Sequence, residues 1–390
     1  MQNYYVDLHI HIGRTATGKP VKITGAKSLT IENILVEATE VKGMDMIGVI
    51  DCHVPEVLDE LSVLIDKGEV FEWDEGGLRF QDVTLILGAE IEIYDENCKG
   101  PIHVLAFIPT IEKMREFSVW LSERQKNITL SSQRIYETGL NLQRRVKELG
   151  GLFIPAHVFT PHKSLYGKGV NQTLTEVFDP TMIDGIELGL SSNTEMADQI
   201  SELHSYTFIS NSDAHSLPKI AREYQIIAME TPTFAELKKA LHKEEGRGLI
   251  ANYGLDPILG KYHRTTCEKC FHLMDDYLIE TCPNCSHKGI IKGVYDRLQE
   301  LKDSEDKNTN RPPYIHQVPL EFIPGLGSKT LHKLRDYFKT EMAIIHEAPE
   351  DALLSVVKKP IADTILKARS GQLSIHAGGG GKYGKVKSLE

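Results

Sequence analysis

Short apolar runs alternate with amphipathic stretches over residues 1–260. Runs of this length, rich in Val, Ile, Leu and Phe, favour strands. They lie at Tyr4–Ile12, Met46–Ile50, Val83–Ile93, His103–Phe107, Leu152–Ala156, Gly185–Leu188 and Thr207–Ser210. Helical patterns cover Thr30–Lys42, Ile111–Glu123 and Ser131–Leu149, and Phe234–His242 predicts a closing helix. Such alternation of strands and helices predicts a parallel α/β sheet or barrel.

The pattern changes after this α/β region. Four cysteines cluster at 267–285, the polar stretch Lys302–Pro313 has the composition of a linker, and short helical patterns follow. A chain of 390 residues is long enough for two or three domains. We expect an α/β domain (1–262), a cysteine module (263–300), a linker (301–313), a helical domain (314–376) and a flexible Gly-rich tail (377–390).

The composition indicates where the protein is expected to be found, but it does not indicate what the protein does. Hydrophobic residues make up 41% and charged residues 25%, as in ordinary globular proteins. No apolar run is long enough for a membrane span and the N-terminus lacks a secretory pattern, so we expect a cytoplasmic protein without a membrane partner. The net charge of −11 divides into −14 before Tyr314 and +3 from there on. The total charge therefore does not decide whether the chain binds DNA.

Histidines and carboxylates recur where the predicted strands end. In an extended segment Asp7, His9 and His11 project to one side, and Asp213 and His215 do the same. Further candidates at strand ends are Asp51, His53, Glu90, His103, His157 and Glu187. A single histidine of this kind is more often a packed or surface residue, but the recurrence at successive strands indicates a metal site. Clustered divalent metals activate water and clamp a phosphoryl group, which favours phosphoester hydrolysis.

This order of motifs resembles the PHP phosphoesterase superfamily over residues 1–245. The resemblance implies a distorted (β/α)7 barrel holding two or three divalent ions (Zn, Mn, Fe or Mg). It implies metal ligands at His9, His11, Glu90, His103, His157, Asp213 and His215, with catalytic roles for Glu90, Asp213 and His215. The second motif departs from the usual Asp-His, because the chain reads Asp51-Cys52-His53. We favour His53 as a ligand and Asp51 either as a ligand or as a residue that supports the ligands.

The cysteines at 267–285 form two CxxC knuckles. Cys267, Cys270, Cys282 and Cys285 have the spacing of a tetrahedral structural zinc. A redox dithiol is the alternative reading. A site with four protein ligands has no vacant position, so it would fold a small module rather than perform chemistry.

The segment 323–335 is similar to a helix-hairpin-helix motif. Gly325 and Gly327 permit a tight turn, and the helix after them offers free N–H groups to a phosphate. Ser328, Lys329 and Lys333 would add contacts to the DNA backbone. An ordinary glycine-bearing turn is the alternative. A degenerate second copy at 349–371 would mainly pack against the first. Gln372–Ile375 resembles a sliding-clamp-binding peptide without its aromatic end, or is simply a helix terminus.

A PHP site, a Cys₄ module and a helical hairpin in this order resemble the endonuclease Q family. The resemblance implies nicking of double- or single-stranded DNA 5′ to deaminated bases (uracil, hypoxanthine, xanthine) and at abasic sites, leaving 3′-hydroxyl and 5′-phosphate ends. A DNA substrate also implies that the protein is associated with the nucleoid. The loop 158–169 would hold the flipped base, with Phe159, His162 and Tyr166 as candidates, or these are ordinary loop residues. Rival readings are a small-molecule phosphatase of the histidinol-phosphate type and an inactive DNA-binding scaffold.

Overall fold

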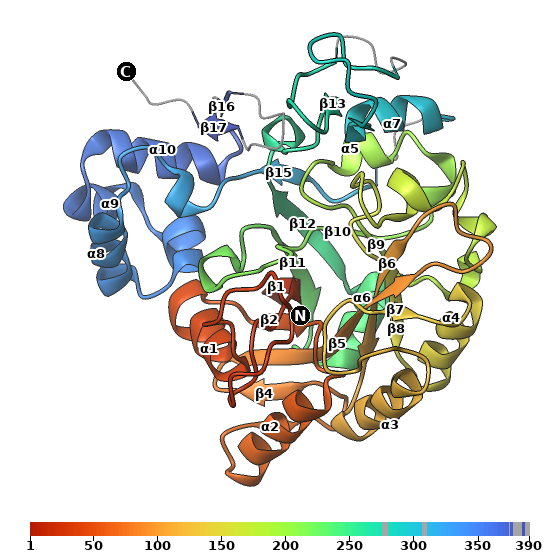
Figure 1. The fold of residues 1–390 in the computed structure, drawn as a ribbon. Helices are drawn as coiled ribbons and strands as arrows, with labels where there is room; N and C mark the ends of the chain where they lie inside the picture. The colour runs from red at the N-terminus through yellow and green to blue at the C-terminus, as the bar shows by residue number, and fades with distance from the viewer. Residues whose placement is uncertain (275–279, 306–309, 374, 377–383, 387–390) are drawn as a thin grey trace.

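The computed structural model describes residues 1–390 except 275–279, 306–309, 374, 377–383 and 387–390. An α/β body built from the first two thirds of the chain occupies most of Figure 1, and a group of helices lies beside it in blue. No helix in the described ranges is both long enough and apolar enough to cross a membrane.

Seven strands of the described chain form a barrel, which confirms the predicted α/β barrel. They follow one another in the order β1 (Gln2–Ile10), β2 (Met46–Val49), β5 (Val83–Ile93), β6 (Ile102–Ile108), β8 (Leu152–Pro155), β9 (Ile186–Glu187) and β10 (Phe208–Ile209). Between β8 and β9, the Asp184 N–H donates to the Phe153 carbonyl and the Val158 N–H to the Glu187 carbonyl, each at 3.0 Å. The ring closes where Ala214 forms a parallel bridge with Ile10.

The barrel is not wholly parallel, although the strand–helix alternation predicted a parallel sheet. Strand β6 runs antiparallel to both β5 and β8. The reason is local: residues 94–101 contain no helix, so the chain returns beside β5 as a hairpin. Beyond β1 the sheet continues through strands that the sequence reading missed. These are the antiparallel β11 (Tyr224–Met229) and β12 (Gly248–Gly254), then β15 (Tyr314–His316). On the other side, β4 (Leu78–Phe80) and β7 (Arg134–Ile135) pair with β5, and β3 (Phe71–Glu72) pairs with β4.

Helices surround the barrel, and one of them, α6, packs into its interior. They are α1 (Ile31–Val36, continued by a π-helical turn over Glu37–Lys42), α2 (Pro55–Asp66), α3 (Ile111–Ser122), α4 (Gly139–Glu148), α5 (Thr194–Ala197) and α6 (Phe234–His242). The predicted helix 131–149 is wrong over its first eight residues. Thr138 caps α4, its hydroxyl accepting the Asn141 N–H at 3.2 Å, and the segment before it contains β7. Helix α6 matches its prediction and packs Phe234 and Leu237 into the barrel interior.

Side-chain alternation explains which residues reach the end of the barrel interior. Ile86 on β5 belongs to the interior cluster, so Glu90, four residues on, points the same way. Leu105 on β6 also belongs to the interior cluster, so His103, two residues earlier, points into the barrel as well. On β1 a register shift between Asp7 and Ile10 changes the alternation, because Leu8 is interior while Ile10 joins the outer core. The shift lets His9 and His11 continue the inward face.

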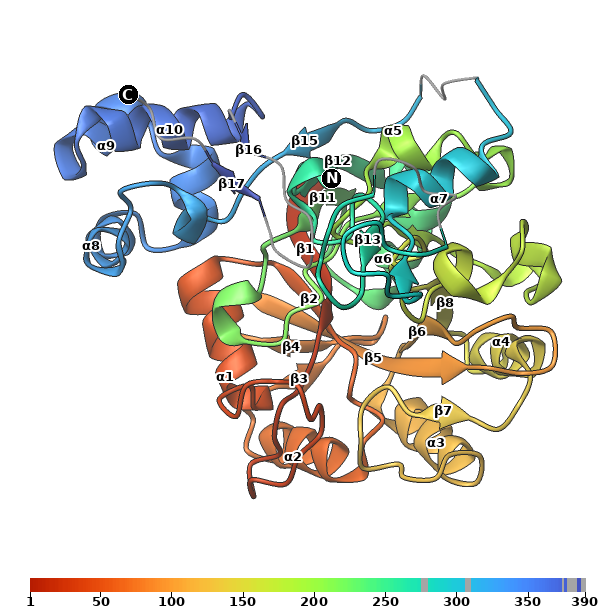
Figure 2. The same ribbon diagram turned by 45° about the horizontal axis from the view of Figure 1, so that its top comes forward.

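The cysteine segment leaves the barrel after β12 and returns through α7 (Val294–Leu301). It contains the short pair β13 (Thr266–Cys267) and β14 (Ile290–Ile291). Arg297 on α7 donates to the carbonyls of Tyr166, Val170 and Asn171 at 2.9, 3.2 and 2.6 Å. These bonds fix α7 against the loop that follows β8, and Figure 2 shows the segment lying over that end of the barrel.

The C-terminal helices are α8 (Ser328–Phe338), α9 (Glu350–Val356) and α10 (Lys359–Arg369). His346, between α8 and α9, packs on the barrel: its ring stacks on Tyr5 at 5.0 Å and its Nε2 lies 2.6 Å from the Tyr224 hydroxyl. A buried ion pair joins Lys42 to Glu341 at 2.8 Å. The helices therefore hold a fixed position beside β1 and β11.

Some predictions fall partly outside the described residues. They concern part of the cysteine module (275–279), part of the linker (306–309), one residue of the clamp-like peptide (374) and most of the tail (377–383, 387–390). Within the described part of the tail, β17 (Lys385–Val386) pairs with β16 (Ile375–His376).

Candidate metal centre

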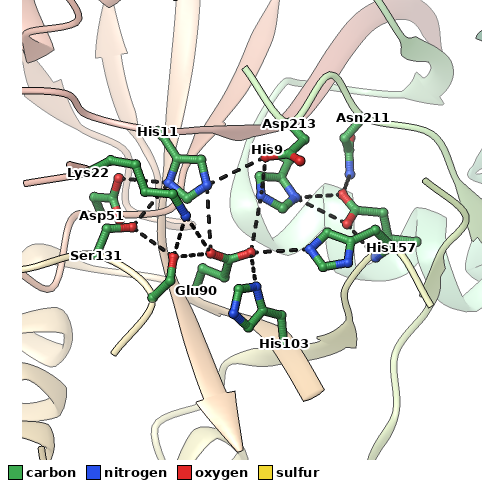
Figure 3. A network of polar contacts seen from close by, with 12 residues as sticks. His9, His11, Lys22, Asp51, Glu90, His103, Ser131, His157, Asn211 and Asp213 are labelled. Carbon is green, nitrogen blue, oxygen red and sulfur yellow. Dashed lines mark hydrogen bonds and ion pairs between the residues drawn. The ribbon is translucent and has the colours of Figure 1, made fainter. Parts of the chain in front are cut away.

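Glu90 lies at the middle of a buried cluster at the barrel rim (Figure 3). Its Oε1 is 2.8 Å from His103 Nδ1 and 3.4 Å from His157 Nε2. Its two oxygens each lie 3.7 Å from a further imidazole, Oε1 from His9 Nε2 and Oε2 from His11 Nε2. One carboxylate thus faces two pairs of histidines, as a bridging ligand would.

Asp213 completes the cluster from the segment after β10. Its Oδ1 lies 3.5 Å from the Nε2 atoms of both His9 and His11, and 3.2 Å from His215 Nε2. Three overlapping sets of side chains place ligand atoms within 4.8 Å of one another. They are His9–His11–Glu90, His11–Asp213–His215 and Glu90–His103–His157. The structure therefore brings together seven of the nine residues predicted for this cluster.

Carboxylates behind the cluster orient its histidines. Glu187 lies 2.9 Å from His9 Nδ1, and Asn211 donates to the same carboxylate at 2.8 Å. Asp51 lies 3.0 Å from His11 Nδ1. With each Nδ1 engaged, the Nε2 atom is the one presented to the cluster, as in metal sites whose histidines are held by acidic side chains.

The cluster fits a set of divalent metals. The Nε2 atoms of His9 and His11 are buried and have no hydrogen-bond partner among the described residues. A buried ring nitrogen without a partner is costly unless something else binds it. Imidazole and carboxylate donors suit zinc, manganese and iron.

Opposite charges in the cluster counteract the effect of burial. Burial alone raises the pKa of Glu90, but His103 and Lys22 hold it well below its usual value. Burial likewise acts on Asp213, whose pKa the imidazole of His9 holds well below its usual value. Burial lowers the pKa of His9, yet Glu187 and Asp213 raise it to about 10. The carboxylates are thus held ionised, the form that binds a cation.

Strained backbone also gathers at the cluster. His157, Asp213 and Ser132 have positive φ angles of 31°, 44° and 54°. Non-glycine residues seldom adopt this region, and it persists where the surroundings over-determine it. Gly189 (φ 82°) packs against His157: a Cβ added there would lie 2.9 Å from His157 Cβ. The chain is therefore shaped to hold these ligands.

In the second motif, Asp51 takes one of its two predicted roles. Asp51 supports His11 and accepts the Ile12 N–H at 2.8 Å. His53 is fully buried and belongs to none of the three sets in the described chain, so its role as a ligand stays a prediction. Asp7 also lies outside them, because its carboxylate accepts the N–H groups of Ser212 and Ala221 at 3.0 and 2.9 Å. Its role is to hold the chain that carries Asp213.

Three polar residues of the cluster were missed by the sequence reading. Lys22 Nζ lies 3.1 Å from Glu90 Oε2 and 2.6 Å from Ser132 Oγ. Ser132 also donates to Glu90 Oε2, and Ser131 Oγ lies 3.2 Å from His11 Nδ1. All three lie in loops, where no periodic signal marks them.

The proposed base-binding loop is wrong for two of its three residues. Phe159 and Tyr166 are buried and stack on each other at 5.4 Å, and the Tyr166 hydroxyl donates to Glu202 at 2.8 Å. They belong to the core and cannot stack on a base. His162 is exposed and meets the Tyr262 ring at 5.3 Å. A cavity of about 440 Å³ instead opens beside the cluster, and its lining includes His157, Thr160, Asn211, His215, Lys219 and Tyr262.

The four cysteines of the two knuckles come together. Cys267 Sγ lies 3.6 Å from Cys285 Sγ, and Cys270 Sγ lies 3.6 Å from Cys282 Sγ. All four sulfurs lie within 4.8 Å of one another. This closed set fits one tetrahedral zinc.

The glycines of the hairpin motif precede α8 as predicted. Gly325 has φ 81°, and Gly327 is the N-cap residue of the helix that begins at Ser328. Ser328, Lys329 and Lys333 are exposed. The geometry is compatible with backbone contacts to DNA, which stay a prediction.

No family model matches the chain. The chain is 58% identical over 388 residues to the uncharacterized protein YqxK of Bacillus subtilis (strain 168), covering 99% of this chain and 100% of that one. It resembles the crystal structure of the lesion-specific endonuclease PfuEndoQ from Pyrococcus furiosus, with a TM-score of 0.85, 32% identity, and coverage of 100% of this chain and 96% of that one. The crystal structure of endonuclease Q with a 27-mer duplex substrate carrying an abasic lesion at the active site also has a TM-score of 0.85, with 31% identity over 100% and 97% of the two chains.

The chain is an α/β-barrel protein with a histidine–carboxylate cluster at the rim of the barrel. The similarity to PfuEndoQ covers all of this chain, including the cysteine module and the C-terminal helices, and 96% of PfuEndoQ. The chain belongs to the endonuclease Q family.

Proposed function

We propose that the chain is a metal-dependent DNA repair endonuclease. It hydrolyses the phosphodiester 5′ to deaminated bases (uracil, hypoxanthine, xanthine) and at abasic sites, leaving 3′-hydroxyl and 5′-phosphate ends. The observation that carries the proposal is that two sets of side chains able to bind a metal ion, each with two histidines, share Glu90. They occur in a chain that matches, end to end, an endonuclease Q whose structure holds an abasic duplex at its active site.

The metals would be held by residues of the rim. His9, His11 and Asp213, with His215 beside them, form one binding set, and His103 and His157 form the other. Glu90 belongs to both sides. Bound divalent ions supply a water of lowered pKa and a clamp for an in-line displacement at phosphorus.

The chain's own residues prepare this chemistry. Glu187 and Asp51 fix the rings of His9 and His11 through their Nδ1 atoms. The positive φ angles of His157 and Asp213 aim these side chains into the cluster. Because the cluster is buried on its barrel side, substrate must arrive from the cavity of about 440 Å³.

The damaged nucleotide would bind in this cavity rather than at the buried loop residues Phe159 and Tyr166. A flipped nucleotide needs one wall that it can stack on and polar groups that reach its edges. Tyr262 supplies the ring, and Asn211 and Thr160 supply polar groups in the same lining. The exposed Lys329 and Lys333 would contact the DNA backbone away from the lesion, and one zinc would hold the four cysteines.

A nicking assay tests the proposal. The chain is incubated with Mn²⁺ and end-labelled duplexes that carry one deoxyuridine, deoxyinosine or abasic site, beside an undamaged duplex. Cleavage 5′ to the lesion alone, with a 3′-hydroxyl that a polymerase can extend, supports it.

Two other outcomes would overturn it. Release of phosphate from histidinol phosphate without DNA nicking identifies a small-molecule phosphatase. Tight binding of damaged DNA without turnover, under every divalent metal tried, identifies a scaffold.

A further inference from the structure

Lys22 is a cation placed inside the candidate metal cluster. Its side chain is only 15% exposed, and its Nζ donates to Glu90 Oε2 at 3.1 Å and to Ser132 Oγ at 2.6 Å. The charges of Asp51 and Asp213 also act on it. Figure 3 shows the ammonium beside Asp51, on the side of Glu90 that faces away from His103 and His157.

The backbone holds Lys22 in this position. Its N–H donates to the Ile12 carbonyl at 2.8 Å, directly after His11. The neighbouring Val21 carbonyl accepts the Ser131 N–H at 3.0 Å. At Gly13 a Cβ would lie 2.0 Å from the Ala26 carbonyl oxygen, so only glycine lets the two parts of this loop approach. Lys22 is therefore a built part of the site.

The ligand atoms of the described cluster account for two ions. The sets His9–His11–Glu90 and His11–Asp213–His215 share His11, whose Nδ1 is engaged by Asp51 at 3.0 Å. With one ring nitrogen left, His11 serves a single ion, so these two sets form one site. Glu90, His103 and His157 form the second. The remaining carboxylate surface, at Glu90 Oε2 and towards Asp51, is where the Lys22 ammonium lies.

We propose that Lys22 takes the place of a third metal ion, so that the barrel of this protein holds two divalent ions and one fixed ammonium. The inference rests on the proposed function, since it concerns the same cluster. It names Lys22 as a positioning residue that acts through Glu90. A fixed cation beside the shared carboxylate lowers the affinity of that carboxylate for further cations and limits their number.

Metal counting tests the inference without relying on activity. The full chain is equilibrated with Mn²⁺, and bound manganese and zinc are measured by mass spectrometry, with anomalous diffraction at the manganese edge to locate the ions. We expect two manganese ions at the rim of the wild type. In Lys22→Met we expect either a third ion or manganese binding tightened by about tenfold or more, because a neighbouring positive charge has been removed.

Two variants serve as controls. Lys22→Arg keeps the charge and should keep two ions with wild-type affinity. Lys19→Met removes an exposed lysine of the same segment, paired with Glu56 on the surface, and should change nothing. Circular dichroism at each step shows whether a variant is folded.

The failures are distinguishable. Three rim ions in the wild type, or unchanged number and affinity in a folded Lys22→Met, overturn the inference and leave the nuclease proposal standing. If Lys22→Met does not fold, the wild-type count and a diffraction map of Lys22→Arg decide. A wild type that binds no manganese at the rim overturns the proposed function and this inference with it.

Discussion

The barrel rim and the C-terminal third are both proposed to contact DNA, but their candidate residues differ in burial and in their distance from one another along the sequence. The rim gathers His9, Glu90, His157 and Asp213 from strands far apart in the sequence, and buries or strains most of them. The C-terminal third keeps each candidate group within a short segment: two CxxC knuckles, then the turn before α8. The two candidate lysines, Lys329 and Lys333, are exposed. Buried charge costs free energy that a metal recovers, whereas exposed cations cost little and suit phosphate contacts.

This difference predicts a division of labour that can be broken by experiment. Changes at the rim should reduce turnover and metal binding while the fold is retained. Changes in the C-terminal third should weaken DNA binding while kcat at saturating substrate is retained.

The largest effect is expected at Asp213. Asp213→Asn removes a charge that faces His9, His11 and His215, so nicking should fall by about 10³-fold, or about 4 kcal/mol of barrier. The midpoint of thermal unfolding should stay close to that of the wild type. The matched control is Asp59→Asn, which removes an exposed carboxylate paired with Arg115. A variant of Asp213 that keeps more than a tenth of the activity would place the chemistry elsewhere.

The next effect concerns the cysteine module. Cys282 is buried among the four sulfurs, so Cys282→Ser should lose the zinc and unfold the module locally. Zinc content, proteolysis within 263–300 and DNA affinity should all change. Manganese binding at the rim should not. The control is Cys98→Ser, outside the cluster. Loss of rim metal in Cys282→Ser would show that the two regions fold as one unit.

A change behind the ligands should be smaller than a change at the ligands. Glu187→Gln keeps the shape of the side chain but weakens its bond to His9 Nδ1. Metal affinity should fall by about 10–100-fold, a typical cost for such supporting residues. Titration with Mn²⁺ measures it, and excess metal should restore much of the activity. Failure of excess metal to rescue would assign Glu187 a direct part in turnover.

Acid should weaken the packing of the C-terminal helices on the barrel, where His346 contacts Tyr5 and Tyr224. Burial, then Arg369, lowers the pKa of His346 to about 4, whereas an unfolded histidine titrates near 6.5. Above pH 6.5 neither state is protonated, and stability is complete. As the pH falls towards 4 the unfolded state binds a proton that the folded state refuses, so about 1–3 kcal/mol of stability is lost.

His346→Phe should remove this part of the acid sensitivity. Denaturant unfolding at pH 7 and pH 4.5 measures it, with the exposed His332→Phe on α8 as the matched control. If wild type and His346→Phe lose the same stability on acidification, the docking of the helices does not depend on neutral His346.

The same contrast explains what the sequence could predict. Glu90 and His103 follow strict alternation along β5 and β6, so their inward direction could be predicted. Asp213 and the cysteines stand in recognisable short motifs. By contrast, Lys22 and Ser132 reach the cluster through loops, where proximity depends on tertiary hydrogen bonds.

Burial inside a loop was equally invisible from the sequence. Tyr166 is an aromatic residue with a hydroxyl group, a type that suits a base-binding pocket. In the structure its ring packs on Phe159 and its hydroxyl donates a hydrogen bond to Glu202. The second motif shows a related limit: His53 is absent from the sets of ligand atoms in the described chain, whereas Asp51 supports His11. Motif and alternation identify positions on strands, and neither specifies how loops fold over them.

The smallest effect is expected for the exposed lysines of α8. Lys329→Ala with Lys333→Ala removes two exposed charges from α8. DNA affinity should fall by about threefold to tenfold, and the slope of log affinity against log salt should decrease by about two, one for each lost phosphate contact. The loss should be equal for damaged and undamaged duplexes, because backbone contacts carry no sequence information. The matched control is Lys67→Ala with Lys113→Ala on the outside of the barrel. If the double variant instead lowers kcat at saturating DNA, α8 takes part in forming the reactive complex, and the division between a rim for chemistry and a C-terminal third for binding fails.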